Sequence, residues 1–363
     1  MAITTIGLGD AKACIKWSGL LAVDTLKQSY WTSRFMATGS ASSAPIVVFN
    51  ELDAGAGDSI SFDVSMQISA APVEGDDILE GNEQSLSFFT DKLYIDISRQ
   101  GINAGTRMSQ QRTVHSLREV ARRRLSDYFS RLFDEVITAY ASGARGVNAD
   151  WVLPTSWTGR ANNSLSAPDA DHLQYAGNAT AKNDLDSNDT VTLAMIDKLV
   201  ATAKSMPDMP LQPVPVEGGE KFVFMMGPWA EYSLRTSTGS DNTWVNVQRS
   251  LAGAVGRDSE LFKGALGEYA GVVLHVNPRT VQFSDYGNPA SVKAARGLFL
   301  GHQAIAMGFG AGSNRLRFQW VEDTADLENQ VIIAAHAIWG CKKVTFNSKD
   351  FGVIAVDYAD QRG

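Results

Sequence analysis

The stretch that decides the fold is QRTVHSLREVARRRLSDYFSRLFDEVITAYASGARG, residues 111–146. Its apolar residues recur at steps of three and four, as in an amphipathic helix: Val114, Leu117, Ala121, Leu125, Tyr128, Leu132 and Val136. The spacing predicts one uninterrupted helix ending at Gly143, with Ser116 (in an S-x-x-E pattern) or Thr113 as its N-cap. About 30 residues at 1.5 Å each give a rod of about 45 Å. An apolar stripe of this length predicts a β-sheet along much of the helix.

The same helix carries a run of basic residues. Arg122, Arg123 and Arg124 are consecutive, and helical spacing places Arg118, Arg122 and Arg131 on or near one flank. The run can be a solvated helix face, which is the usual role of clustered charges. It can also hold an acidic loop that reaches over from a neighbouring copy of the chain. Contact with DNA is a third interpretation, although the chain as a whole is acidic.

A long hairpin precedes the helix. SISFDVSMQIS, residues 59–69, alternates strictly between apolar and polar side chains, and a second alternating strand is expected at about 86–98. The segment between them, AAPVEGDDILEGNEQ, contains no basic residue. Its acidic residues are Glu74, Asp76, Asp77, Glu80 and Glu83. Because an isolated two-stranded arm is marginally stable in water, we expect it to lie against another surface, and the acidic tip indicates that this surface is basic.

Composition excludes several classes of protein. The 363 residues carry a net charge of -8, which argues against a general nucleic-acid binder. The two cysteines, Cys14 and Cys341, are far apart, so we expect two buried thiols in a reducing compartment. No apolar run approaches the ~18 residues of a membrane span, and the first residues lack the order of a signal peptide. We therefore expect an intracellular product that has no contact with membranes.

The search for an enzymatic site finds no convincing pattern. GFGAG at 308–312 resembles a dinucleotide-binding loop, but the following RLRFQW reads as a strand where such a loop must open a helix. DLDSND at 184–189 begins like a calcium loop, yet Asp189 and Met195 occupy the positions of the required glycine and glutamate. The five histidines are scattered, without metal-ligand spacing. We expect no catalytic residues, cofactor, metal site or small-molecule substrate.

The remaining chain divides into segments of different character. Residues 1–50 are polar and weakly periodic, so we expect an extended arm that is ordered by something outside itself. Residues 147–190 predict an irregular surface excursion. A helix is expected from 192, then a strand, turn and short helix over 221–235 with Pro228 near the helix start. Glycine-punctuated strands follow over 260–312, and three strand-like runs occupy 315–359.

This order of parts resembles the capsid fold of phage Hong Kong 97, an α+β fold with an N-arm, a long β-hairpin E-loop, a P-domain with a long spine helix, and an inserted A-domain. Local stretches also resemble the major capsid proteins of the phage N-four type. They include EGNEQSLSFFTDKLYID at 80–96, RTVHSLREVARRRLSDYFSRLFDE at 112–135, FVFMMGPWAEYSLRT at 222–236, LFKGALGEYAGVVLH at 261–275, RGLFLGHQAIAMGFG at 296–310 and KKVTFNSKDFGVIAVD at 342–357. The similarity runs in order from about residue 50 to 357, and residues 147–190 depart from it.

The resemblance implies five parts: an N-arm at 1–50, an E-loop at 51–110, a first part of the P-domain at 111–190, an A-domain at 191–312 and closing P-domain strands at 313–363. It implies a major capsid protein, without enzymatic activity, that assembles as hexamers and pentamers into an icosahedral head around double-stranded DNA. The E-loop is expected to lie across the adjacent subunit, and the DNA to touch the inner face without sequence specificity.

Scaffolding, portal and decoration proteins are the expected partners. The protein is expected in the capsid of the virion, which is assembled in the host bacterial cytoplasm. The alternative function is that of an encapsulin-like cellular shell protein, which belongs to a different class of structural protein. A third possible function is that of an enzyme or adhesin whose site cannot be recognised from the sequence.

Overall fold

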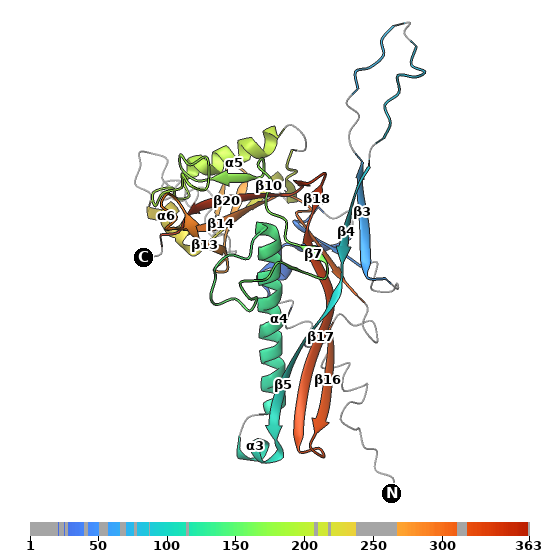
Figure 1. Cartoon of the computed structure of the whole chain (residues 1–363), viewed down its shortest axis with the longest axis vertical. Helices are drawn as coiled ribbons and strands as arrows, with labels where there is room; N and C mark the ends of the chain where they lie inside the picture. The colour runs from blue at the N-terminus through green and yellow to red at the C-terminus, as the bar shows by residue number, and fades with distance from the viewer. Residues whose placement is uncertain are drawn as a thin grey trace.

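The computed structural model describes residues 21, 25, 28–39, 43–50, 57–65, 70–75, 78–86, 88–113, 116–206, 210–216, 219–236, 267–310 and 318–361. These residues form an elongated α+β molecule with two sheets (Figure 1). A narrow half containing a long helix extends in one direction. A hairpin with a long loop extends in the opposite direction, and the second sheet lies to one side.

The first sheet has the order β1-β2-β15-β17-β16, with β5 paired to the other edge of β17. Its strands are β1 (Met36–Thr38), β2 (Ile46–Phe49), β5 (Asp96–Thr106), β15 (Ile305–Phe309), β16 (Phe318–Ala325) and β17 (Gln330–Lys343). Strand β17 is the organising strand, because β16 and β5 flank its first part and β15 pairs with its end. Helix α4 (Leu117–Ser142) packs along one face of this sheet.

Helix α4 is shorter than the predicted helix. Ser116 is its N-cap, with a side chain that accepts a hydrogen bond from the Glu119 amide, and Gly143 ends it in the left-handed conformation at φ 68°. Both caps were predicted, but the prediction of an uninterrupted helix from residue 111 is wrong. Residues Arg107–Arg112 form a separate short helix, α3, and Thr113 is extended with φ −107° and ψ 142°. An extended residue ends the helical hydrogen-bond ladder, so α4 begins anew at the Ser116 cap.

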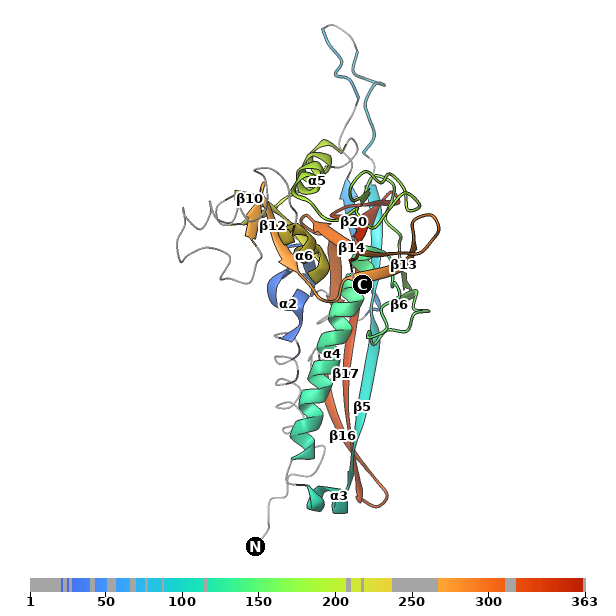
Figure 2. The same cartoon turned by 90° about the vertical axis from the view of Figure 1, so that its left-hand side faces the viewer.

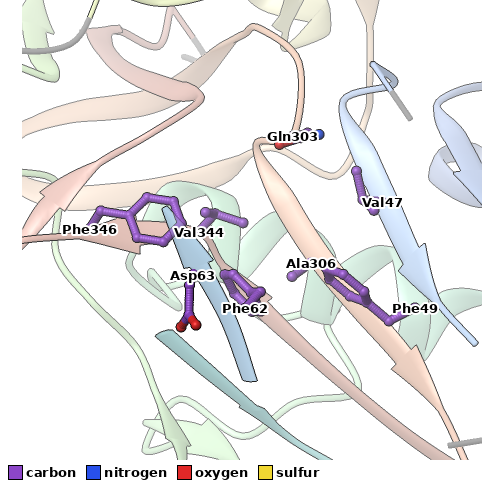
Figure 3. A pocket seen from close by; sticks show the side chains of 8 residues that line it. All are labelled: Val47, Phe49, Phe62, Asp63, Gln303, Ala306, Val344 and Phe346. Atoms are coloured by element: carbon purple, nitrogen blue, oxygen red, sulfur yellow. The ribbon is translucent and has the colours of Figure 1, made fainter. Parts of the chain in front are cut away.

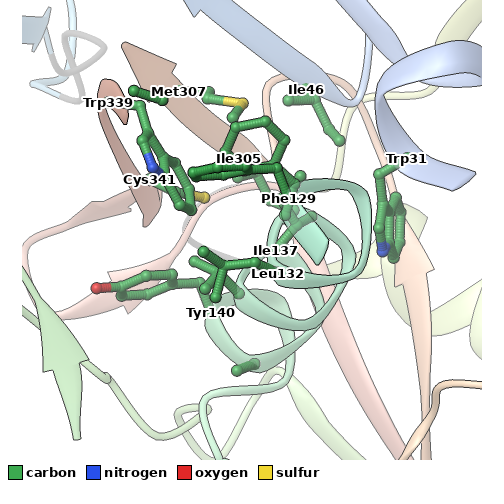
Figure 4. Packing of buried hydrophobic residues seen from close by; sticks show 14 of the residues in the cluster. Trp31, Ile46, Phe129, Leu132, Ile137, Tyr140, Ile305, Met307, Trp339 and Cys341 are labelled. Atoms are coloured by element: carbon green, nitrogen blue, oxygen red, sulfur yellow. The ribbon is translucent and has the colours of Figure 1, made fainter. Parts of the chain in front are cut away.

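The predicted apolar stripe is confirmed as the helix–sheet core. Leu125, Phe129 and Phe133 are at most 1% exposed. The ring of Phe133 meets that of Trp339 on β17 edge to face, with centroids 4.4 Å apart. Figure 4 shows further members of this core from α4, β15 and β17, with Ile46 beside them.

The N-terminal segment is folded into this core. Helix α2 (Tyr30–Arg34) is capped by Ser29, and the Asp134 carboxylate of α4 accepts hydrogen bonds from the Ser29 hydroxyl at 2.6 Å and the Tyr30 amide at 3.1 Å. Trp31 is fully buried, and its indole N–H donates to Thr138. The expectation of an arm ordered only from outside is therefore wrong for residues 29–38 and 46–49. Their buried partners lie about a hundred positions away in sequence, so local polarity did not reveal them.

The second sheet has the order β11-β12-β10-β14-β20-β8, with β13 on β14 and β9 on β10. Its strands are β8 (Leu173–Tyr175), β9 (Val214–Val216), β10 (Gly219–Met226), β11 (Gly267–Tyr269), β12 (Val272–Val276), β13 (Val281–Tyr286), β14 (Val292–Leu300) and β20 (Val353–Ala359). Helices α5 (Leu193–Ser205) and α6 (Pro228–Thr236) share one apolar core with it. The opposite face contributes Met225, Leu298 and Val353 to the core around α4.

Two strands cross the predicted segment boundaries. Strand β15 falls in the range 191–312 but belongs to the first sheet, and β20 falls in 313–363 but lies between β14 and β8 of the second sheet. A buried ion pair joins β14 to β20 within the second sheet, and its arginine also links this sheet to α4. The Arg296 guanidinium on β14 donates to both carboxylate oxygens of Asp357 on β20, at 2.6 and 2.8 Å, and to the Ser142 carbonyl at the end of α4, at 2.8 Å.

The predicted excursion at 147–190 has little regular structure, as expected. Besides β8 it contains β6 (Gly159–Arg160) and β7 (Asn163–Ser164). It is nevertheless attached to a small hairpin formed by β18 (Thr345–Phe346) and β19 (Lys349–Asp350). Asp171 forms an ion pair with Lys349 at 2.6 Å, and the Asp169 carboxylate accepts a hydrogen bond from the Asp350 amide at 2.8 Å. Cys341 is buried as predicted, which raises the pKa of its thiol, whereas Cys14 lies outside the described residues. Among the helices described, none is both long and apolar enough to cross a membrane.

Candidate functional site

The root of the predicted hairpin packs on the face of the first sheet opposite α4. Strands β3 (Ser59–Ser65) and β4 (Phe88–Tyr94) pair antiparallel, and β5 follows β4 after one residue, so the predicted second strand is divided. Gly340 on β17 allows this approach, because a Cβ there would lie 2.0 Å from the Tyr94 carbonyl oxygen. Ile60 and Leu93 are buried beneath the hairpin, and the rings of Phe49 and Phe62 stack at 5.4 Å.

A small cavity of about 150 Å³ opens beside this root. Figure 3 shows its lining, which comes from β2, β3, the turn before β15, β15 itself and the β17–β18 region. The lining side chains are Val47, Phe49, Phe62, Asp63, Gln303, Ala306, Val344 and Phe346. Apart from Asp63 and Gln303 these side chains are apolar, so the cavity offers no constellation for acid–base or nucleophilic chemistry.

Beyond its root the hairpin projects away from the body (Figures 1 and 2). Glu74, Glu80 and Glu83 are exposed there, whereas Asp76 and Asp77 lie outside the described residues. Glu83 accepts a hydrogen bond from the Gly81 amide at 2.8 Å. Across the described part of the chain, no basic group lies within ion-pair distance of these three carboxylates.

The arginines of α4 are mostly on its surface, and several have partners in their own chain. Arg118 pairs with Glu322 on β16 at 2.6 Å, and Arg124 lies 3.6 Å from Asp127. Arg131 donates to the Asp150 carbonyl at 2.9 Å. Arg122 is half-buried and Arg123 is exposed. Arg118 is therefore engaged within its own chain, by a partner 204 positions away.

The acidic loop and the arginines do not meet within one copy. Helix α4 begins beside α3 at one end of the molecule, and the hairpin loop is at the other end in both views (Figures 1 and 2). Only the loop of another copy can reach these arginines.

Sequence patterns weighed as enzymatic sites take structural roles. In GFGAG, Gly308 belongs to strand β15 and lies against the hairpin root. Gly310 follows the strand and lies against Ile338. Asp189 of DLDSND is buried, and its carboxylate accepts from the Asp186 amide at 2.8 Å, so it closes its own turn. Burial lowers the pKa of His275 to about 4, with the charge of Arg34 acting in the same direction. In the ranges that the structure describes, no group of three or more His, Cys, Asp or Glu could hold a metal ion.

Comparison with known proteins identifies the family. A family model described as phage capsid protein matches residues 5–361. The chain belongs to the phage capsid protein family. It is similar to the capsid of Ralstonia phage GP4, with 44% identity, a TM-score of 0.82 and full coverage of both chains. The major capsid protein of Pseudomonas phage KPP25 is 27% identical over 321 residues, which cover 78% of this chain and 79% of that protein.

A more distant structure shares the fold of this capsid protein. The capsid of cyanophage Pam1 is 21% identical, with a TM-score of 0.75 over 93% of this chain and 94% of that one. The mixed helix-and-sheet architecture is therefore a phage capsid fold. The predictions of a tailed-phage major capsid protein, a structural component of the virion without enzymatic activity, are confirmed by the family and its relatives, which do not favour the encapsulin alternative.

One property of the capsid protein's projecting loop was missed from the sequence. Three of its apolar side chains are largely exposed, Ile78 at 71%, Leu79 at 60% and Leu86 at 62%, as is Phe88 at 62% where β4 begins. Large exposed apolar patches mark interaction sites. The sequence carries a signal for this property, because EGDDILEGNEQSLSF places apolar residues among acidic ones.

Proposed function

We propose that this capsid protein assembles as hexamers and pentamers into the icosahedral head that encloses the double-stranded DNA of a tailed phage. The observation that carries the proposal is the projecting loop. It presents acidic and apolar side chains that its own copy leaves uncovered, at the end opposite the exposed arginines. An element of this kind is stabilised only when a second copy covers it, and repetition of one such contact around a closed ring builds a capsomer.

We further assign the parts of the Hong Kong 97 fold. Residues 1–50 are the N-arm, 51–110 the E-loop, 111–190 the first part of the P-domain with α4 as spine helix, 191–312 the A-domain, and 313–363 the closing P-domain strands. The sheet pairings favour two adjustments, with β15 counted in the P-domain and β20 in the A-domain. The closer kinship with the phage N-four type stays a prediction from the quoted stretches.

The acidic loop is proposed to contact the arginines of an adjacent copy. Its residues are Glu74, Asp76, Asp77, Glu80 and Glu83, and the facing residues are Arg118, Arg122, Arg123, Arg124 and Arg131. Exposed ion pairs contribute less than about 1 kcal/mol each, so the contact acts through several pairs repeated over the shell and weakens with salt.

Further partners follow from the proposed role. Scaffolding, portal and decoration proteins join the shell, assembly takes place in the host bacterial cytoplasm, and the packaged DNA touches the inner face without sequence specificity. The net charge of -8 supports loose contact with DNA, because an acidic shell repels the phosphate backbone.

The test replaces Glu74, Asp76, Asp77 and Glu80 together by serine. We expect at least a tenfold loss of shells, counted by negative-stain microscopy, with an unchanged thermal melt of the unassembled chain. A matched control, Ala71→Ser with Val73→Ser, alters the same loop without removing charge and should give normal shells. Unchanged shell yield in the fourfold variant overturns the acidic contact. Persistent monomers of the unaltered chain, with and without a scaffold partner, overturn the assembly itself.

A further inference from the structure

The cavity beside the hairpin root, which we call the root cavity, has a buried floor and a polar rim. Its volume is about 150 Å³. The floor is made of apolar side chains that are at most 6% exposed, namely Val47, Ala306, Val344 and Phe346. Asp63, which is exposed, and Gln303, which is half-buried, stand at the rim. A small molecule can therefore reach an apolar interior by passing two polar groups.

Aromatic rings form one side of the root cavity. The ring of Phe62 stacks on that of Phe49, with centroids 5.4 Å apart and planes 13° apart, and it meets Phe346 edge to face at 6.0 Å (Figure 3). Apolar cavities of about this volume bind molecules of the size of benzene. The face of an aromatic ring also attracts a positive charge. The lining therefore suits an apolar body of about one ring, with a cation close to it.

Asp63 contributes a negative charge that its own chain does not neutralise. Across the part of the chain that the structure describes, no basic group lies within ion-pair distance of its carboxylate. The neighbouring strand of the hairpin carries Asp91, which is paired with Lys342, the residue opposite Ala306 on β17. Because that pair is neutral as a unit, Asp63 sets the sign of the charge at the rim.

Gln303 reaches the rim from a strained turn. Its φ is 51°, and its amide donates to the Ala44 carbonyl at 2.9 Å. A residue other than glycine is strained in this left-handed region, and strained residues gather at sites that clamp ligands. The carboxamide oxygen of Gln303 is a hydrogen-bond acceptor, and it lines the same cavity as Asp63.

We propose that the root cavity binds a small organic cation, a primary ammonium group on an apolar body of about one aromatic ring. The ring occupies the floor, and the ammonium group stays at the rim, where it donates to the Asp63 carboxylate. An anion of the same size is repelled by Asp63, and a neutral molecule gains the apolar contacts alone. The bound cation touches β3 of the hairpin and β2 and β15 of the body, so it holds the root against the sheet. Binding does not require assembly and is independent of the proposed function.

The experiment titrates the unassembled chain, with carbon-13-labelled valine methyl groups, with benzylammonium, benzyl alcohol or phenylacetate. Benzylammonium should move the methyl resonances of Val47 and Val344 and leave those of Val200 on α5 unchanged. An exposed opposite charge strengthens binding by up to about fivefold, and a like charge weakens it similarly. We therefore expect benzylammonium to bind about fivefold more tightly than benzyl alcohol and about twentyfold more tightly than phenylacetate.

Three variants test the roles of charge and volume. Asp63→Asn should bind benzylammonium no more tightly than benzyl alcohol, with an unchanged melting temperature because the side chain is exposed. Asp58→Asn removes an exposed carboxylate that precedes β3 but does not line the cavity, so this matched control should keep the preference. Ala306→Val fills part of the floor and should weaken binding of all three compounds about fivefold.

Several results would overturn the root cavity as a cation site. They are unmoved resonances of Val47 and Val344, equal affinities for the three compounds, and an unchanged preference for benzylammonium in Asp63→Asn. Resonance changes that extend to Val200 would show adsorption over the whole surface and overturn it as well. If Ala306→Val does not fold, the titrations of the unaltered chain and of Asp63→Asn still decide the question.

Discussion

The buried pair of Arg296 and Asp357 gives the sharpest prediction about stability. Their side chains are 7% and 0% exposed, and Tyr286 also donates to Asp357 at 2.7 Å. Arg296→Met removes both hydrogen bonds to the carboxylate and the one to the Ser142 carbonyl, and it leaves a buried charge without a counter-ion. Breaking a buried pair in this way costs about 3–5 kcal/mol. The second sheet should therefore separate from the end of α4 more readily.

The double variant Arg296→Met with Asp357→Leu should be more stable than Arg296→Met alone. Removing both charges abolishes the desolvation penalty and leaves about 1–2 kcal/mol, because the Tyr286 hydroxyl loses its acceptor. Urea unfolding, followed by tryptophan fluorescence, measures the free energy of unfolding of four unassembled chains. These are the unaltered chain, Arg296→Met, Asp357→Leu and the double variant. If the single-variant losses add to the double-variant loss within about 0.5 kcal/mol, the two side chains are not coupled and the reasoning fails.

Three further predictions concern pH and the long helix. The pKa of His275 is lowered to about 4, so its imidazole stays neutral in the folded state, whereas the unfolded state binds a proton below about pH 6.5. The free energy of unfolding should therefore fall by about 1 kcal/mol from pH 7 to pH 5, and by less in His275→Gln. Thermal melts at both pH values measure this difference. Gly143→Ala should cost about 2–4 kcal/mol in urea unfolding, because its Cβ would lie 2.2 Å from the Ser166 carbonyl oxygen at a φ of +68°. Leu125→Asp should abolish soluble expression because it buries a charge, whereas Val120→Asp, at a position 42% exposed, should express normally; equal solubility would contradict the placement of the stripe.

Local signals in the sequence were sufficient for the elements themselves. The S-x-x-E pattern and Gly143 located both ends of α4, and strict alternation located β3. These features depend on residues only a few positions apart. The extended Thr113, which separates α3 from α4, had no such local mark.

Long-range partners could not be predicted in the same way. The N-terminal segment reads as polar, yet Asp134 and Thr138 bind Ser29 and Trp31 across more than 100 positions. Likewise, nothing near Arg118 indicates its pairing with Glu322. The acidic loop was predicted because its composition alone sets it apart, whereas the surface that it is proposed to contact belongs to a second molecule.

The placement of β17 and β20 has a consequence for biosynthesis. β17 is the interior strand to which β5, β15 and β16 all pair, and β20 separates β14 from β8 in the other sheet. A nascent chain that has reached only residue 325 has neither strand, so β5, β15 and β16 lack their common partner and β14 is not joined to β8. The two sheets cannot both be completed until translation has passed residue 359, and until then ribosome-bound intermediates expose unpaired strand edges, which are prone to aggregation. A chain that ends before residue 330 lacks the strand that joins β5, β15 and β16, and it cannot form the complete first sheet.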